Sequence, residues 1–335
     1  MATIKDKESL SKIENLENAD FLVVEHAEKL REGTSLINLA WRQGGRWREL
    51  LNDITNRGFY LYMVKDQLKS CFVQHKAVSK LWSKVRSGEF SISDSGVIYT
   101  YEPPALADVP PNLLVIFSSM TESIFSPFLM RYFAQNFSSI KKYVPENTAI
   151  LRIADIGGVT GAFYLNTNYL DRNEENIQSL ISEIARRISA TKVVLYGGSK
   201  GGTGAFYHSL AGGYSSVCVE PIISDDYYFR LRNDLHLIDG IFPFSKQEKF
   251  SELLECSSSR DIDSDIIYSH ASPQIEYIKP MLLERYPGRF SYFNSMHPEI
   301  SDHPDVSRKT IHLVTSLINF KLLGVPRLRG NYNIV

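Results

Sequence analysis

A serine inside a glycine-rich pentapeptide is the residue of this sequence best suited to nucleophilic chemistry. Ser199 is at the centre of Gly197-Gly198-Ser199-Lys200-Gly201, which directly follows the run 191–196 with its apolar strand-like end 193–196. The G-x-S-x-G pattern is typical of a strained strand-to-helix turn whose small neighbours let the strand and the helix approach closely. Because such a turn presents the serine hydroxyl at a helix N-terminus, it predicts acyl transfer or ester hydrolysis with Ser199 as the nucleophile.

A serine hydroxyl is a weak nucleophile at neutral pH, so this chemistry needs a histidine base further along the chain. His303 lies in Ser301-Asp302-His303-Pro304-Asp305, between the last predicted strand and the last predicted helix. His297 lies in the same segment and remains an alternative. We rank His303 first because it is nearer to the final helix.

A carboxylate that orients the histidine is expected between the serine and the histidine in chain order. The segment after the predicted strand 265–268 has no aspartate, and Glu276 is its first carboxylate. Asp225 and Asp226 follow the preceding predicted strand. We rank Glu276 first as the acid, Asp225 second and Asp226 third, and each of them could equally be a helix cap or a solvated surface charge.

Two backbone N–H groups are expected to form an oxyanion hole. The first is that of Lys200, the residue after the serine, and the second comes from the loop after the predicted strand 113–117, where Ser119 and Met120 are the candidates. The side chain of Lys200 is unusual at this position. It is either solvated or able to hold an anionic group of the substrate.

The motifs give little indication of phosphate, dinucleotide or metal binding. The glycine-rich turn is not a P-loop, because Thr203 stands where that motif requires lysine, and no G-x-G-x-x-G can be aligned with it. The sequence has no H-E-x-x-H, and its eight histidines do not pair with carboxylates at metal-ligand spacing. We therefore expect no bound cofactor and no metal, and the sequence identifies no cofactor-binding residue.

Short apolar runs alternate with longer helical stretches from residue 113 onward, the pattern of βαβ units in a mostly parallel sheet. We expect strands at 113–117, 149–154, 193–196, 216–219, 265–268 and 289–293, and helices near 127–137, 174–190, 202–210, 246–254, 275–286 and 306–323. The predicted fold class is α/β, with an α/β-hydrolase-like sheet flanked by helices.

The first part of the chain has a different pattern. Charged helical segments near 5–16 and 76–86 accompany isolated strand-like runs at 21–24 and 59–64, while 97–101 could begin the main sheet as an antiparallel strand. We therefore divide the chain into an N-terminal α+β accessory or cap region, 1–94, and a catalytic domain, 95–335.

Composition limits the classes of partner and the cellular compartment that we expect. Lys and Arg total 37 against 38 Asp and Glu, so the net charge of −1 gives no overall attraction to nucleic acid. No run approaches the roughly 20 apolar residues that a membrane-spanning helix needs. Because the polar N-terminus lacks the apolar stretch of a secretory signal, a cytoplasmic location is expected.

The segment 195–205 resembles the corresponding turn of bacterial capsular-polysaccharide biosynthesis proteins of the XcbB/CpsF type and of the related capsule O-acetyltransferase of meningococcal serogroup A. The S-K-G-G-x-G-A core, Ser199 to Ala205, is the specific part of this similarity. Weaker similarity covers 113–119, 161–164, 220–227 and 302–318.

This resemblance implies an α/β-hydrolase fold, a Ser-Asp/Glu-His triad and acetyl transfer from acetyl-coenzyme A to sugar hydroxyls. Ser199 and His303 match the nucleophile and base motifs, whereas 272–276 replaces an aspartate-containing loop. The implied partners are a polysaccharide or sugar acceptor and capsule glycosyltransferases, at the inner face of the membrane. The first ninety or so residues have no counterpart in the acetyltransferase.

The leading hypothesis is thus a serine acyltransferase or esterase that modifies a capsular or surface polysaccharide through an acyl-Ser199 intermediate. The alternative is a non-catalytic scaffold of a capsule-assembly complex that keeps the hydrolase fold. A third reading, sugar-phosphate or nucleotide binding at the glycine-rich turn, would not need the Ser199 hydroxyl.

Overall fold

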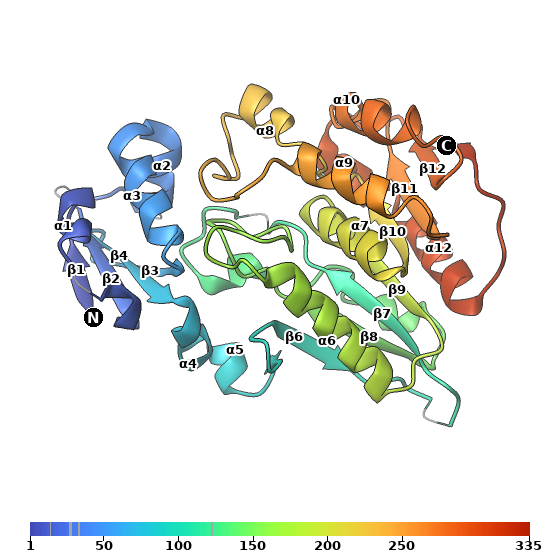
Figure 1. Ribbon diagram of the computed structural model, residues 1–335, viewed down its shortest axis with the longest axis horizontal. Helices are drawn as coiled ribbons and strands as arrows, with labels where there is room; N and C mark the ends of the chain where they lie inside the picture. The colour runs from blue at the N-terminus through green and yellow to red at the C-terminus, as the bar shows by residue number, and fades with distance from the viewer. Residues whose placement is uncertain (14, 27–28, 33, 107, 122) are drawn as a thin grey trace.

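The computed structural model describes residues 1–335 apart from positions 14, 27–28, 33, 107 and 122. Within the described residues the strands form a four-stranded sheet near the N-terminus and a nine-stranded sheet that carries the rest of the chain. The small sheet lies at one end of the molecule, and the large sheet extends from the middle to the other end (Figure 1).

The large sheet has the order β13-β12-β11-β10-β9-β7-β8-β6-β5. All neighbours from β13 to β8 are parallel, while β6 runs antiparallel to β8 and β5 antiparallel to β6. Its strands are β5 (Ser91–Ile92), β6 (Ile98–Glu102), β7 (Asn112–Phe117), β8 (Thr148–Ile153), β9 (Val193–Gly198), β10 (Ser215–Val219), β11 (Ser264–Tyr268), β12 (Ser291–Ser295) and β13 (Asn331–Ile334). The predicted α/β class with a mostly parallel sheet is confirmed.

Helices cover both faces of this sheet. On one face lie α6 (Asn173–Arg187), α7 (Lys200–Gly212), α9 (Lys246–Cys256) and α10 (Ile275–Ile278), and on the other lie α11 (His303–Lys309) and α12 (Ile311–Leu323). Successive side chains of β7 point to opposite faces of the sheet. Leu113 and Val115 pack toward α6 and α7, whereas Leu114 and Ile116 pack toward α12. Burial on both faces explains why the central strands are continuous apolar runs.

Some predicted elements differ from the structure. The helix expected at 127–137 is only a 3-10 turn, Leu129–Tyr132, in a loop that the buried Arg131 stabilises by donating to the carbonyls of Val159 and Leu61. The helix expected at 306–323 is divided at Thr310 into α11 and α12. Strand β13, which follows α12, was not predicted.

The N-terminal region contains its own α+β unit. The small sheet has the order β1-β2-β4-β3, and α2 and α3 pack against it. Its elements are β1 (Ala2–Ile4), α1 (Lys7–Ser11), β2 (Phe21–Glu25), α2 (Leu36–Gln43), α3 (Gly45–Thr55), β3 (Phe59–Lys65) and β4 (Lys69–Gln74), followed by α4 (Val78–Leu81) and α5 (Ser83–Arg86). The division at residues 94 and 95 stays a prediction; β5 and β6, on either side of it, pair with each other.

Helix α3 joins the two parts of the molecule. Arg48, Asn52 and Asn56 are spaced four residues apart and therefore share one face of the helix. Asn52 donates to the carbonyl of Asp239 at 2.9 Å, Asn56 donates to that of Gly240 at 2.9 Å, and Arg48 forms an ion pair with Asp234. The N-terminal α+β unit thereby holds the segment 234–240, which follows β10 of the large sheet.

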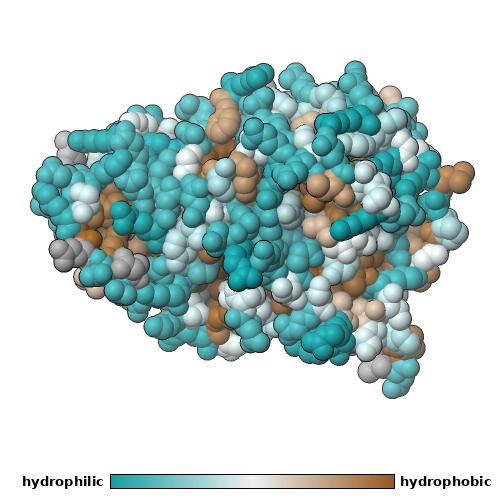
Figure 2. Space-filling view, in the orientation of Figure 1, coloured by the Kyte–Doolittle hydropathy of each residue, from teal (hydrophilic) through white to brown (hydrophobic). Residues whose placement is uncertain are grey.

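The surface gives two further observations. No helix in the described ranges is long and apolar enough to cross a membrane. Hydrophilic residues predominate on the face in Figure 2, where apolar residues form small separate groups.

Asp234→Ala is expected to loosen the segment 233–240. This change removes the ion pair with Arg48 and the acceptor for the N–H groups of Ile238 and Asp239, in a loop where Asn233 and Asp234 already have positive φ. Hydrogen exchange followed by mass spectrometry should show faster exchange in 233–240. Asp53→Ala, which breaks only the exposed contact with Lys7, is the control, and equal exchange in both variants would contradict the assigned role of α3.

Candidate active site

Ser199 occupies a tight turn between the central strand β9 and helix α7. Its backbone has φ 55° and ψ −121°, a strained conformation for a residue with a side chain. Two glycines make the turn sterically feasible. A Cβ atom on Gly197 would overlap the carbonyl oxygen of Gly201, and one on Gly201 would overlap that of Phe117. The predicted strand, turn and helix are present, and they direct the serine hydroxyl beyond the carboxyl end of the sheet.

His303 contacts Ser199 from helix α11, which lies on the opposite face of the sheet from α7. It is the first residue of α11, is 8% exposed, and its Nε2 lies 2.7 Å from Ser199 Oγ. Asp302 caps the helix by accepting from the N–H of His303 at 2.8 Å, and its carboxylate also accepts two hydrogen bonds from Arg232. The cap fixes the first turn of α11 and with it the position of the imidazole.

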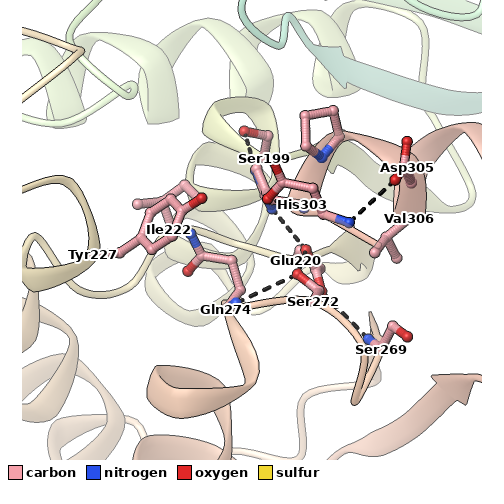
Figure 3. A network of polar contacts seen from close by, with 12 residues as sticks. Ser199, Glu220, Ile222, Tyr227, Ser269, Ser272, Gln274, His303, Asp305 and Val306 are labelled. Carbon is pink, nitrogen blue, oxygen red and sulfur yellow. Dashed lines mark hydrogen bonds and ion pairs between the residues drawn. The ribbon is translucent and has the colours of Figure 1, made fainter. Parts of the chain in front are cut away.

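Glu220 completes a continuous series of hydrogen bonds (Figure 3). It follows β10 directly and is 1% exposed, and its Oε2 lies 2.7 Å from His303 Nδ1. Oε2 also accepts from the hydroxyl of Ser272 at 2.7 Å, and Oε1 accepts from the N–H of Ser269 at 3.3 Å. The buried carboxylate is therefore satisfied by donors from two other segments, as a buried charge requires.

The structure corrects the predicted acid. Glu276 is exposed on α10, and it is Glu220, not Glu276, that contacts His303. Asp225 forms a buried ion pair with Lys246 at 2.6 Å, whereas Asp226 forms an exposed ion pair with Arg230 at 3.1 Å. The physical reason is register: β10 is the neighbour of β9, so the first residue after β10 is already level with the serine turn.

The position of Glu220 in the sequence could have indicated its contact with the histidine. It immediately follows the predicted strand 216–219, and it begins the stretch 220–227 of weaker similarity. The predicted candidates, Glu276, Asp225 and Asp226, all lie further from the ends of their strands. The alternative base, His297, accepts from the N–H of Glu299 at its Nδ1, whereas the contact with Ser199 belongs to His303.

The expected oxyanion donors have different surroundings. The N–H of Lys200 is in the first turn of α7, where a helix offers no intrahelical acceptor. The N–H of Ser119 donates to Asn136 Oδ1 at 2.7 Å and is therefore occupied. For the N–H of Met120 no acceptor exists among the described residues. The pair Lys200 and Met120 thus remains available, whereas Ser119 positions the loop.

The side chain of Lys200 is neither solvated nor free to hold a substrate group. It is fully buried, and its Nζ lies 2.9 Å from Asp155 Oδ2. The carboxylate of Asp155 also accepts from the N–H groups of Phe163 and Tyr164, both of which have positive φ. Lys200 therefore fixes the loop 155–164 beneath the serine.

A second buried polar pair lies beside Ser199. Tyr228 on α8 (Asp226–Leu231) is 2% exposed, and its ring centroid lies 4.0 Å from that of His236. Burial raises the pKa of Tyr228, although a hydrogen bond with the Ser199 side chain acts in the opposite direction. Burial, with Lys246, His303 and Lys200 nearby, holds the pKa of His236 well below its ordinary value. Both side chains are therefore neutral near pH 7.

The arrangement suits nucleophilic chemistry. With Nδ1–H of His303 donating to Glu220, Nε2 is the acceptor that can take the proton of Ser199. No group of three His, Cys, Asp or Glu residues in the described part of the chain is arranged to hold a metal ion.

A mostly parallel sheet, a strained serine turn after its central strand and a histidine supplied after a late strand define the α/β-hydrolase fold. The sequence matches no protein-family model and no curated protein.

Solved structures are similar in fold. One is the Glycosylation Associate Protein (Gap123) complex from Streptococcus agalactiae, with a TM-score of 0.51 and 20% identity over 72% of this chain and 47% of that chain. This chain thus spans about half of that one, and at this identity the likeness shows the fold alone. An S-formylglutathione hydrolase from Agrobacterium tumefaciens has a TM-score of 0.49 and 13% identity, covering 71% of this chain and 94% of its own. The capsule O-acetyltransferase of Neisseria meningitidis serogroup A has a TM-score of 0.46 and 17% identity, covering 68% and 93%.

Glu220→Gln is expected to slow the reaction of Ser199 with a fluorophosphonate by about 10²- to 10⁴-fold, because the imidazole loses the carboxylate that orients it and stabilises its charge. Glu276→Gln, the same chemical change on exposed α10, should react like the wild type. The measurement is the labelling rate of folded protein, checked by circular dichroism. A normal rate for Glu220→Gln, or an equal loss for Glu276→Gln, would refute the assignment of the acid.

Lys200→Met is expected to lower the free energy of unfolding by about 3 kcal/mol or more, because it leaves the buried Asp155 carboxylate without its cation. Lys84→Met removes an exposed ion pair with Glu89 and should have little effect. Urea denaturation measures both variants. Similar midpoints for Lys200→Met and the wild type would show that the buried pair does not hold the loop 155–164.

Proposed function

We propose that the protein is a serine-dependent acyltransferase or esterase that acts through an acyl-Ser199 intermediate, with O-acetyl transfer as its reaction. The observation that carries this proposal is the unbroken hydrogen-bond series from Ser199 through His303 to Glu220, at 2.7 Å for each step. Ser199 is the nucleophile, His303 the general base and acid, and Glu220 the residue that orients the imidazole.

In the first half-reaction, Ser199 Oγ attacks the carbonyl carbon of the acyl donor while its proton passes to His303 Nε2. The negative charge that develops on the carbonyl oxygen is stabilised by the N–H groups of Lys200 and Met120. The intermediate then collapses: the bond from carbon to the leaving group breaks, the leaving group takes the proton from His303, and the acyl group stays on Ser199.

In the second half-reaction, a hydroxyl group of the acceptor, or water, gives its proton to His303 and attacks the acyl-enzyme. The bond to Ser199 Oγ breaks, and the serine recovers its proton from the imidazole. Glu220 keeps the imidazolium in place in both halves, because its carboxylate is anchored by Ser269 and Ser272.

The proposed acceptor is a sugar hydroxyl of a capsular or other surface polysaccharide, and the proposed donor is acetyl-coenzyme A. The S-K-G-G-x-G-A similarity around Ser199 to the capsule-biosynthesis proteins supports this choice. On this view the protein acts in the cytoplasm with capsule glycosyltransferases, at the inner face of the membrane.

A second candidate function is a non-catalytic scaffold of a glycan-assembly complex. The fold likeness to a chain of the S. agalactiae glycosylation-associated complex and the separate N-terminal α+β unit favour it. The hydrogen bond between Glu220 and His303 argues against this candidate, because it supplies a carboxylate that could orient the imidazole. The two candidates differ in whether the Ser199 hydroxyl is needed.

The test is acetyl release from acetyl-coenzyme A, or from an acetylated glycan, by the wild type, Ser199→Ala and Ser123→Ala. Ser123 is exposed on the loop after β7 and serves as the matched control. We expect Ser199→Ala to lose activity by about 10³-fold or more and Ser123→Ala to keep it. Equal release by the wild type and Ser199→Ala would reject the proposal, and co-purification with glycosyltransferases without any release would favour the scaffold.

A further inference from the structure

The N-terminal region contains a pocket with no part in the chemistry at Ser199. It has a volume of about 380 Å³, within the range of small-ligand sites, and lies where α2 ends and α3 begins, opposite the segment after β2. The two helices cover the small sheet at the end of the molecule that carries the N-terminus (Figure 1). None of the described residues that line this pocket contacts Ser199.

Its lining is strongly basic in a protein whose net charge is −1. Lys29, Arg31, Arg42 and Arg46 contribute to the wall, and no Asp or Glu does so among the described residues. None of the four cations forms an ion pair within the part of the chain that the structure describes, and Arg46 lies over the ring of Trp47 at 4.6 Å. Such a concentration of unpaired positive charge favours an anionic ligand.

The start of α3 adds backbone donors to this wall. Its cap, Gly44, has no side chain to accept from the first N–H groups, and the first turn, Gly45 to Trp47, holds no acidic residue. Gly44 and Gly45 have positive φ, and a Cβ atom on either would meet nothing within 4 Å, so the approach to this helix end is open. The N–H of Trp47 donates to the carbonyl of Gly44 at 3.2 Å, so the N–H groups of Gly45 and Arg46 are the donors that the start of α3 offers.

A buried histidine provides an independent sign of a ligand. His26 lines the pocket and is 7% exposed, yet its Nδ1 has no hydrogen-bond partner among the described residues. Its Nε2 lies 2.9 Å from Ser70 Oγ, which also accepts from the N–H of Leu36 at 3.0 Å. The Ser70 hydroxyl has no other acceptor for its own hydrogen among the described residues, so it donates to Nε2, which leaves Nδ1–H as a donor without an acceptor.

We infer that this pocket is a binding site for a phosphate group, held by the guanidinium groups of Arg42 and Arg46, the N-terminus of α3 and Nδ1–H of His26. Planar guanidinium groups and helix N-terminal N–H groups both match the geometry of phosphate oxygens. The phosphate could belong to a soluble cofactor or to a phosphorylated sugar. The site is separate from the Ser199 chemistry and does not depend on it.

The test is a titration of the full-length protein with inorganic pyrophosphate, followed by calorimetry and by the intrinsic tryptophan fluorescence, to which Trp47 contributes together with Trp41 and Trp82. We expect saturable binding that weakens by about tenfold or more in Arg42→Gln/Arg46→Gln, because each charged hydrogen bond lost is a substantial share of a small ligand's affinity. Arg86→Gln/Arg186→Gln is the matched control. It removes the same charge from two exposed positions, and its affinity should equal that of the wild type.

Ser199→Ala should bind pyrophosphate normally, so this experiment can fail or succeed independently of the proposed acyl transfer. Competition by coenzyme A and by glucosamine 1-phosphate identifies the source of the phosphate, and displacement by either supports the site. Absence of saturable binding, or an equal loss in both double variants, would overturn the inference.

Discussion

The carboxylate of Glu220 is the contact on which the arrangement at the carboxyl end of the large sheet depends. It joins three elements that are distant in sequence: the end of β10, the segment 269–272 after β11, and the first residue of α11. A buried carboxylate is costly unless donors surround it, and here Ser269, Ser272 and His303 satisfy it. The same bonds that make the charge tolerable orient the imidazole toward Ser199.

Buried ionic and polar contacts also fix the segments that surround Ser199. The pair Lys200–Asp155 ties the residue after the serine to the loop 155–164, so the backbone of Lys200 is fixed by its own side chain. Helix α3 of the accessory region holds the segment 234–240, which carries His236 against Tyr228. The accessory region is therefore mechanically connected to the surroundings of Ser199.

Local patterns predicted the parts of the site that depend on neighbours in sequence. The turn at Ser199 follows from its glycines and its apolar strand, and His303 follows from its place before the final helix. The acid was missed because its choice depends on strand order: β10 pairs with β9, so a residue at the very end of β10 reaches the histidine. Glu276 lies in the segment after β11, one strand further away, on an exposed helix.

The sequence likewise predicted the central part of the fold but not all of its elements. The central strands were found because burial on both faces makes them continuous apolar runs, whereas β13 is a mostly polar strand at the edge that only pairing with β12 reveals. A helix was expected at 127–137, but tertiary hydrogen bonds of Arg131 determine the shape of this segment. Lys200 was expected in solvent, since the sequence does not show that Asp155 lies beneath it.

The most direct test of the account is mass-spectrometric peptide mapping of the protein after brief reaction with an activated acetyl ester and an acid quench. The account predicts an acetyl ester on the peptide that contains Ser199, formed by the wild type and greatly reduced in His303→Ala. An acetyl group on a different residue, or equal modification of Ser199 in His303→Ala, would contradict the claim that the hydrogen-bond series from Ser199 to Glu220 is the reacting unit.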